Sequence, residues 1–303
     1  MGELKTVGII LAAGRSTGLY PSSVSIPEPL LTVYDKPAIF YSISSMIRIG
    51  INNIAVICPP EYYEEYLDAL VRYDIGDLFI TIIPAKNKGK RGVLQDLYNA
   101  KSFCSNADKI VLSFPDDIFV GEEYDNIIKE FSQPSDQFKS IITHSYNLEK
   151  FGVISGPEGN IIEKPTGMQA NLDTRISTGM YYYPDNKIFS VIENILMYAD
   201  DDTNFSITDL NNVYVDMHGA DYIDIRHRAI SWYNINDADT VLKASNHIKE
   251  HYKNTNELLG CIEIEAFKKG FITTDDTIYL MSLIQTTDLH SAPFYVRYII
   301  NNL

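Results

Sequence analysis

The sequence predicts an α/β protein built from parallel β-α-β units. Apolar runs with the length of strands alternate with stretches of helical periodicity along the first third of the chain. This alternation favours parallel strands joined by right-handed helical crossovers. With 303 residues and 45% hydrophobic content, the chain can bury one large core, or a core with a smaller appendage. The expected strands are 6–13, 53–58, 79–84 and 108–114, and the expected helices are 37–49, 61–72 and 92–103.

The first expected strand leads directly into a glycine loop. A strand that ends in small residues exposes backbone N–H groups, which phosphate oxygens can approach closely. Leu11, Ala12, Ala13 and Gly14 are therefore candidate nucleotide-binding residues. The loop matches neither the dinucleotide-binding nor the Walker pattern, so a glycine turn that merely joins a strand to a helix stays an open alternative.

The expected helix 37–49 has proline near its start and ends before Gly50, as helices commonly do. Residues 138–232 predict shorter strands, interrupted by a helix near 185–199 and by a second helix that a Ser206–Asp209 capping box opens. Residues 237–303 predict mostly helix, with Asn236 and Asp237 as candidate caps.

Charge and cysteine content exclude several classes of partner and site. A formal net charge of −15 disfavours nucleic acids and anionic membranes as partners. Cys58, Cys104 and Cys261 form no Cys-x-x-Cys pair, so neither a disulfide framework nor a zinc site is expected. The apolar run from residue 7 to 13 is too short to span a membrane and lacks the basic head of a signal peptide. We therefore expect a reduced, cytoplasmic protein.

Segments spread along the whole chain resemble the sugar-1-phosphate nucleotidylyltransferases, most closely the glucose-1-phosphate thymidylyltransferase family. This resemblance implies a three-layer α/β/α, Rossmann-like fold with a mixed, mainly parallel sheet and a C-terminal helical appendage. It divides the chain into a core at 1–252 and an appendage at 253–303, which the family associates with subunit contacts and an allosteric nucleotide site. A homo-oligomer, dimer or tetramer, is expected. The segments are 8–21, 30–39, 113–119, 151–153, 162–165, 178–183, 206–211, 231–234 and 261–273.

The activity that the resemblance implies is attack of a sugar-1-phosphate oxygen on the α-phosphorus of a nucleoside triphosphate, which yields a nucleotide sugar and pyrophosphate. Asp116 matches the family's metal-binding aspartate, although a helix-capping role is the alternative. Asn234 stands where the family's Trp-x-Asp pattern has a second carboxylate. We expect Mg²⁺ on Asp116 and Asn234, bound weakly until a nucleotide adds its phosphates.

Other matches concern the substrates. Glu163 and Lys164 match the pair that holds the sugar hydroxyls and the sugar phosphate, with an ordinary solvated ion pair as the alternative. Gly152, Gly179 and Tyr181 match positions that line the sugar pocket, although any glycine at a strand edge would look the same.

The cations that normally face the triphosphate are altered. Gly18 replaces the family's arginine before Leu-Tyr-Pro, and Glu28 replaces a lysine. The glutamine that reads the base is not recognisable, since the corresponding stretch contains Pro84 and a short insertion. Cations elsewhere could replace these lost positive charges, or they could be ordinary solvent-exposed residues of the loop that precedes Gly92. Gly92 itself matches a nucleotide-binding position of the family. These cations are Arg15, Lys86, Lys88, Lys90 and Arg91.

Two functions follow from these substitutions. The chain is either a working nucleotidylyltransferase with a rebuilt phosphate site, using Asp116, Lys164 and Arg15 in catalysis, or a catalytically silent paralogue. The silent paralogue would bind nucleotide or nucleotide sugar and act as a regulatory or scaffolding subunit, with an active paralogue as partner. A different reaction on the same scaffold is a third alternative. The base, the sugar and the oligomeric state stay open.

Overall fold

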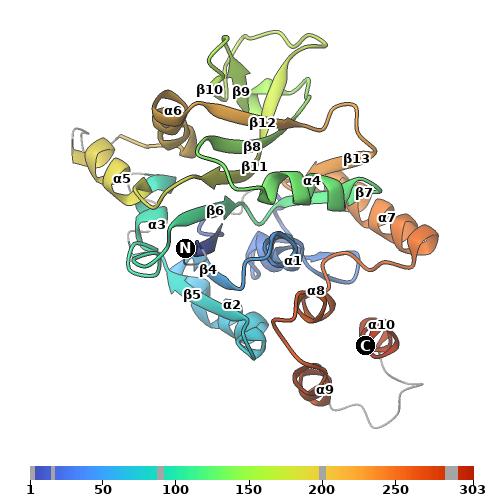
Figure 1. Ribbon diagram of the computed structural model, residues 1–303. Helices are drawn as coiled ribbons and strands as arrows, with labels where there is room; N and C mark the ends of the chain where they lie inside the picture. Colours follow the sequence, from blue (N-terminus) through green and yellow to red (C-terminus); the bar gives the residue numbers. More distant parts are fainter. Residues whose placement is uncertain (1–3, 15–17, 87–91, 198–202, 284–292) are drawn as a thin grey trace.

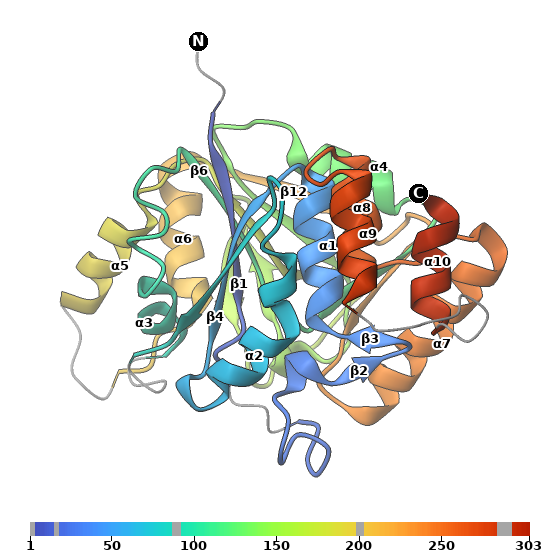
Figure 2. The ribbon, with the colours of Figure 1, turned by 90° about the horizontal axis from the view of Figure 1, so that it is seen from below.

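A computed structural model describes residues 4–14, 18–86, 92–197, 203–283 and 293–303, and it confirms the expected α/β architecture. A nine-stranded mixed sheet lies between two layers of helices (Figures 1 and 2). Two short two-stranded ribbons, β2–β3 and β7–β13, lie outside the sheet. The strands are β1 (Thr6–Leu11), β2 (Thr32–Val33), β3 (Lys36–Pro37), β4 (Asn53–Cys58), β5 (Phe79–Pro84), β6 (Lys109–Ser113), β7 (Asp117–Gly121), β8 (Phe138–Thr143), β9 (Gly152–Ser155), β10 (Asn160–Glu163), β11 (Arg175–Tyr183), β12 (Ala220–Asp224) and β13 (Ile230–Asn234).

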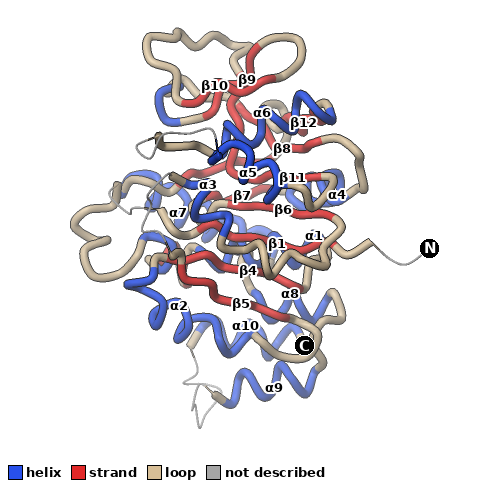
Figure 3. The backbone as a smooth tube through the Cα atoms, turned by 90° about the vertical axis from the view of Figure 1, so that its left-hand side faces the viewer, coloured by secondary structure: helices blue, strands red, loops and turns tan. Residues whose placement is uncertain are grey.

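The sheet order is β10-β9-β11-β6-β1-β4-β5, and β8 joins β11 to β12 (Figure 3). The half that runs from β6 to β5 is parallel, as the sequence predicts. The long strand β11 pairs antiparallel with β6, β8 and β9, so it connects this parallel half to the later strands. The carboxyl ends of β1 and β6 therefore meet at one edge, where ligands bind in open α/β sheets.

The helices cover both faces of the sheet, with short 3-10 turns between some of them. In β1, Ile10 faces one hydrophobic cluster while Ile9 and Leu11 face the other, as strand alternation requires. The α-helices are α1 (Ile39–Ile49), α2 (Tyr63–Leu70), α3 (Val93–Tyr98), α4 (Tyr124–Ser132), α5 (Ile188–Met197), α6 (Ile207–His218), α7 (Ala238–Thr255), α8 (Ile262–Lys268), α9 (Thr274–Ser282) and α10 (Phe294–Asn302), and the 3-10 helices are η1 (Glu28–Leu30), η2 (Pro60–Tyr62), η3 (Val71–Tyr73) and η4 (Leu148–Lys150).

The expected helix ends are largely confirmed. Gly50 ends α1 in the left-handed region, with φ of 99°. The Ser206 backbone N–H and hydroxyl both donate to Asp209, and the Asp237 carboxylate caps α7 by accepting from the Thr240 N–H at 2.8 Å. Helix α3 is shorter than expected, because it ends at Tyr98 and turns replace its last residues.

The C-terminal helices pack on the face of the sheet that carries α1. Helix α7 runs without a break through the expected boundary at residue 252. Buried residues of α8 and α10, such as Ile262 and Ile299, belong to the same hydrophobic cluster as Ile43 of α1. Neither observation tests the expected division into a core at 1–252 and an appendage at 253–303, which stays a prediction. Within the described ranges, no helix is long and apolar enough to cross a membrane.

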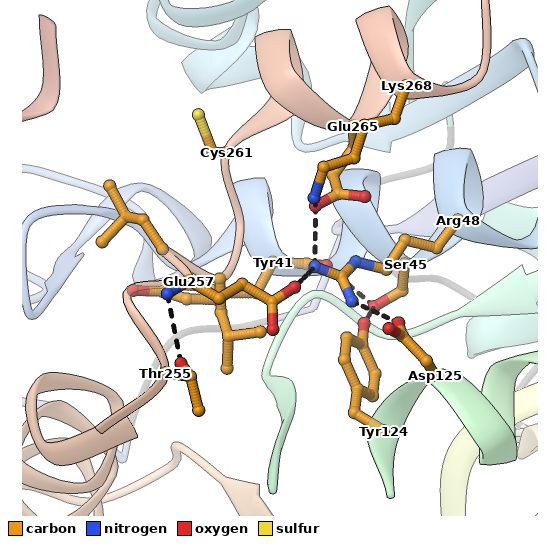
Figure 4. A network of polar contacts seen from close by, with 12 residues as sticks. Tyr41, Ser45, Arg48, Tyr124, Asp125, Thr255, Glu257, Cys261, Glu265 and Lys268 are labelled. Atoms are coloured by element: carbon orange, nitrogen blue, oxygen red, sulfur yellow. Dashed lines mark hydrogen bonds and ion pairs between the residues drawn. The ribbon is translucent and has the colours of Figure 1, made fainter. Parts of the chain in front are cut away.

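A buried arginine ties these helices to the core. Arg48 of α1 is 7% exposed, and its guanidinium donates to Asp125 at 2.6 Å and to Glu265 at 2.7 Å (Figure 4). It also pairs with Glu257 and lies over the Tyr124 ring. One guanidinium thus joins α1, α4 and α8.

We expect Arg48→Ala to lower the free energy of unfolding by about 3–5 kcal/mol, because the buried Glu265 carboxylate loses its hydrogen-bonded cation and keeps only the Lys268 ammonium at 3.9 Å. Urea unfolding followed by circular dichroism measures this. The matched control is Arg72→Ala, which removes an exposed arginine and should change stability by less than about 0.5 kcal/mol. Equal unfolding midpoints for the two variants would contradict the expectation.

Candidate functional site

Two adjacent aspartates follow the end of β6. Asp116 lies in the turn, and Asp117 opens β7, which pairs antiparallel with β13 (Figure 1). The pairing places Asn234 opposite Asp117, and the Asn234 amide nitrogen donates to Asp116 Oδ2 at 2.6 Å. The indole of Trp232 donates to Asp117 Oδ1 at 2.7 Å. The structure therefore brings together Asp116 and Asn234, as the sequence predicts.

Burial governs the charge state of this pair. It raises the pKa of Asp116. Hydrogen bonds from the backbone and from Asn234 lower this pKa, and the Lys164 ammonium lowers it by a smaller amount. Burial raises the pKa of Asp117 further above the usual value, because the Asp116 charge acts in the same direction. The pair is thus a place where a cation would be stabilised.

Gly179 makes room for the second aspartate. A Cβ built on Gly179 would lie 1.8 Å from Asp117 Oδ2 and 2.7 Å from the Phe114 ring. Only glycine fits there unless the Asp117 carboxylate moves. Tyr181, two residues further along β11, is 5% exposed and packs between Phe114 and Phe138. Its side chain therefore supports the core behind the aspartates, and its expected substrate contact stays a prediction.

Strand β10 brings the expected sugar-binding pair to the same region. Glu163 accepts a hydrogen bond from the buried Thr208 hydroxyl at 2.5 Å, and its other oxygen lies 3.4 Å from the Lys164 ammonium. Lys164 adopts a positive φ of 42° just past the strand end. Gly152 pairs with Glu163 across the β9–β10 ladder, and a Cβ there would lie 2.7 Å from Ile161.

The glycine loop is only partly available to a ligand. The side chains of Leu11 and Ala12 are 3% exposed, and the Ala12 N–H already donates to Ile57 at 2.8 Å. Ala13 is partly exposed and Gly14 is exposed, with no described atom within 4 Å of a Cβ built on Gly14. The candidate phosphate-binding N–H groups in the described part of this loop are therefore those of Ala13 and Gly14.

Other candidate positions have structural roles or lie elsewhere. Gly92 opens α3 with φ of 73°, and a Cβ there would lie 2.3 Å from the Phe205 carbonyl oxygen. Lys86 is exposed, and its N–H donates to Asn99 at 3.3 Å. The remaining cations that could compensate lie outside the described residues: Arg15, Lys88, Lys90 and Arg91.

The two substituted cation positions both lie at this site. Glu28 is partly buried in η1, and burial together with the nearby Asp116 charge raises its pKa to about 7. Gly18 contacts the segment after β13, since a Cβ built on it would lie 2.2 Å from the Asn236 carbonyl oxygen. Glu28 is thus an acid at a position where the family resemblance leads us to expect a lysine. The backbone around Gly18 leaves no room for the expected arginine.

The donor set fits a metal ion only if a nucleotide shares it. Within the described ranges, no three His, Cys, Asp or Glu side chains gather as a metal site. Asp116 offers the carboxylate oxygen that Mg²⁺ prefers, and phosphate oxygens would have to supply most other ligands. The Asn234 oxygen accepts from the Asn236 amide at 2.6 Å, so Asn234 would have to turn its amide to become a ligand.

Comparison with known proteins identifies the family. The family model described as nucleotidyl transferase matches residues 7–251. The chain belongs to the nucleotidyl transferase family. A glucose-1-phosphate thymidylyltransferase from Neisseria meningitidis is 28% identical over 88% of this chain and 91% of its own length. A mannose-1-phosphate guanylyltransferase catalytic subunit beta from Danio rerio is 24% identical over 58% of this chain and 49% of its own length.

Solved structures of other nucleotidyl transferases show the same fold. UDP-glucose pyrophosphorylase from Acinetobacter baumanii superposes with a TM-score of 0.63 at 19% identity, covering 85% of this chain and 96% of that chain. The inositol-1-phosphate CTP transferase from T. maritima gives 0.64 at 17% identity, covering 82% and 98%. The family resemblance and the fold expected from the sequence are therefore confirmed.

Sequence reasoning missed the residues that hold the site in place. Asp117, Trp232 and Thr208 lie within the family-like segments 113–119, 231–234 and 206–211, but the sequence alone indicates no role for them. Each acts through a partner more than 40 positions away, and no local pattern signals such pairing. A possible signal was the adjacency of two acids after an apolar strand.

We expect Gly179→Ala to displace the Asp117 carboxylate and to lower the melting temperature, because the new Cβ overlaps Asp117 Oδ2. The cost should be about 1–3 kcal/mol in chemical unfolding. Gly14→Ala is the matched control, because a Cβ there meets no atom of the described residues within 4 Å. Two variants of equal stability would show that Asp117 does not need the space at Gly179.

Proposed function

We propose that this chain is a sugar-1-phosphate nucleotidylyltransferase of the glucose-1-phosphate thymidylyltransferase type. Family membership and the thymidylyltransferase relatives support the proposal. The observation that carries it is the convergence of three groups at one edge of the sheet. Asp116 provides a carboxylate for a cation, the Lys164 ammonium acts on Asp116, and Glu163 is held by Thr208.

In the proposed reaction, an oxygen of the sugar-1-phosphate attacks the α-phosphorus of a nucleoside triphosphate. A new oxygen–phosphorus bond forms, and the bond between the α- and β-phosphates breaks to release pyrophosphate. Such transfers depend mostly on positioning and charge neutralisation. A magnesium ion shared by Asp116 and the nucleotide would neutralise phosphate charge.

The side chains have separate tasks in this scheme. Lys164 supplies a point charge for the sugar phosphate, and the Glu163 carboxylate accepts from two neighbouring sugar hydroxyls. The Ala13 and Gly14 N–H groups at the end of β1 would meet triphosphate oxygens. Asp116 would hold the cation that neutralises phosphate charge.

A second function, that of a catalytically silent paralogue, is favoured by one observation. Glu28 lies close enough to Asp116 for each charge to disfavour the other, so the site carries acids where a triphosphate needs cations. Such a protein would keep the sugar-binding side and bind a nucleotide sugar as a regulatory subunit.

We expect Lys164→Ala to weaken binding of a sugar-1-phosphate or nucleotide sugar by about 1.5–3 kcal/mol, the range for a charged hydrogen bond. Calorimetry with glucose-1-phosphate and a panel of nucleoside diphosphate glucoses measures this. Lys249→Ala, on the exposed side of α7, is the matched control and should bind as the unaltered protein does. Unchanged affinity in Lys164→Ala would remove Lys164 from the sugar site.

We expect Glu28→Lys to raise pyrophosphate release about 10²–10³-fold if the natural protein is an impaired enzyme, because one preorganised charge contact is typically worth that much. The assay combines each common nucleoside triphosphate with a panel of sugar-1-phosphates. Gly18 is left unaltered, since an arginine would clash with the Asn236 backbone. No turnover in either protein, together with nucleotide-sugar binding, would refute the enzyme and leave the regulatory subunit.

A further inference from the structure

The amide of Asn234 is engaged at both ends. Its nitrogen donates to Asp116 Oδ2 at 2.6 Å, with Asp117 Oδ1 at 3.4 Å, and its oxygen accepts from the Asn236 amide nitrogen at 2.6 Å. An amide can face a carboxylate usefully only with its nitrogen. Because Asn236 donates to the oxygen, it fixes the nitrogen end toward the aspartates.

Asn236 itself is held by the backbone on both sides. The Ile235 N–H donates to the Asp116 carbonyl at 2.9 Å, and the Asn236 N–H donates to the Asn234 carbonyl at 2.9 Å. The next residue, Asp237, caps α7. The segment from 234 to 237 is therefore anchored to the turn of Asp116 at one end and to a helix at the other.

The glycine loop rests on the same residue. The Gly18 backbone comes so close to Asn236 that an added Cβ would lie 2.2 Å from the Asn236 carbonyl oxygen. A displacement of the loop toward Asn236 must displace Asn236 as well, since backbone meets backbone with no flexible side chain between them. A contiguous path therefore runs from the loop through Asn236 and Asn234 to Asp116.

We propose that Asn236 is a positioning residue that orients the Asn234 amide toward Asp116 and couples the glycine loop to the Asp116 carboxylate. In this arrangement Asn234 is a hydrogen-bond donor rather than a metal ligand. This coupling between the glycine loop and Asp116 does not depend on the proposed function. Only the kinetic experiment described below rests on that function.

The chemistry of the path makes its direction testable. With Asn236→Asp, the new carboxylate accepts but cannot donate, so it no longer holds the Asn234 amide oxygen and competes with Asp116 for the Asn234 amide nitrogen. With Asn236→Ala, the amide loses its constraint and can adopt either orientation. Asn236→Ser keeps a short donor and should retain part of the natural orientation.

The first experiment observes side-chain amides in protein labelled with ¹⁵N-asparagine, without any ligand. The Asn234 Nδ2 protons, assigned by their loss in Asn234→Ala, should be shifted downfield and slow to exchange, because charge-assisted hydrogen bonds are short and strong. Asn236→Asp and Asn236→Ala should abolish this signature, Asn236→Ser should keep part of it, and Gly18→Ala should shift it.

The matched control is Asn186→Ala, whose amide donates to the Ala107 carbonyl at 2.7 Å away from the site. It should leave the Asn234 signals unchanged. Identical Asn234 signals in the natural protein and in folded Asn236→Asp and Asn236→Ala would overturn the proposal. If Asn236→Asp fails to fold, the Asn236→Ala and Gly18→Ala spectra decide by the same criterion.

The second experiment separates this role from a merely structural one. Asn236→Asp should lower kcat by about ten-fold or more while KM for the sugar-1-phosphate changes by less than about two-fold, since the misplaced group is Asp116 and not Glu163 or Lys164. A rise in that KM with kcat unchanged would overturn the positioning role. If the natural protein turns over nothing but its amide signals respond as expected, the proposed function fails and the coupling stands.

Discussion

Two neighbouring carboxylates held largely out of water at the end of β6 are the constraint around which the site is built. Each must receive hydrogen bonds or a cation, because an uncompensated buried charge is costly. Trp232 and Asn234 supply donors from β13, and Gly179 leaves out a side chain on β11. Outside the main sheet, the short β7–β13 ribbon brings the hydrogen-bond donors of Trp232 and Asn234 to Asp117 and to Asp116 in the preceding turn.

The charge balance of the site differs from what a triphosphate alone would favour. Asp116 lies near both Asp117 and Glu28, and Lys164 is the described cation that acts on Asp116. Under the proposed function, a triphosphate would therefore have to bring its own counterions or meet cations outside the described residues, such as Arg15 and Lys88. The charges of Glu163 and Lys164, by contrast, balance one another.

The fold could be predicted from the sequence because its signals are local. Apolar runs, a capping box and a terminal glycine lie within a few residues of what they specify, as at Ser206–Asp209 and Gly50. Asp116, Glu163 and Lys164 could also be named as candidates, because they occupy recognisable motifs, and their roles stay predictions. What escaped prediction depends on distant pairs. Thr208 reaches Glu163 across 45 positions, and the Gly18–Asn236 contact joins opposite ends of the core.

The β7–β13 pairing also has a consequence for the order in which the protein can assemble during synthesis. Asp117 and its partner Asn234 are separated by 117 positions. At typical elongation rates, roughly ten seconds pass between the synthesis of the first residue and that of the second. Throughout that interval β7 has an unpaired edge and the two acids lack their donors. The parallel half of the sheet can form early, whereas the surroundings of Asp116 and Asp117 must be among the last parts of the nascent chain to become native.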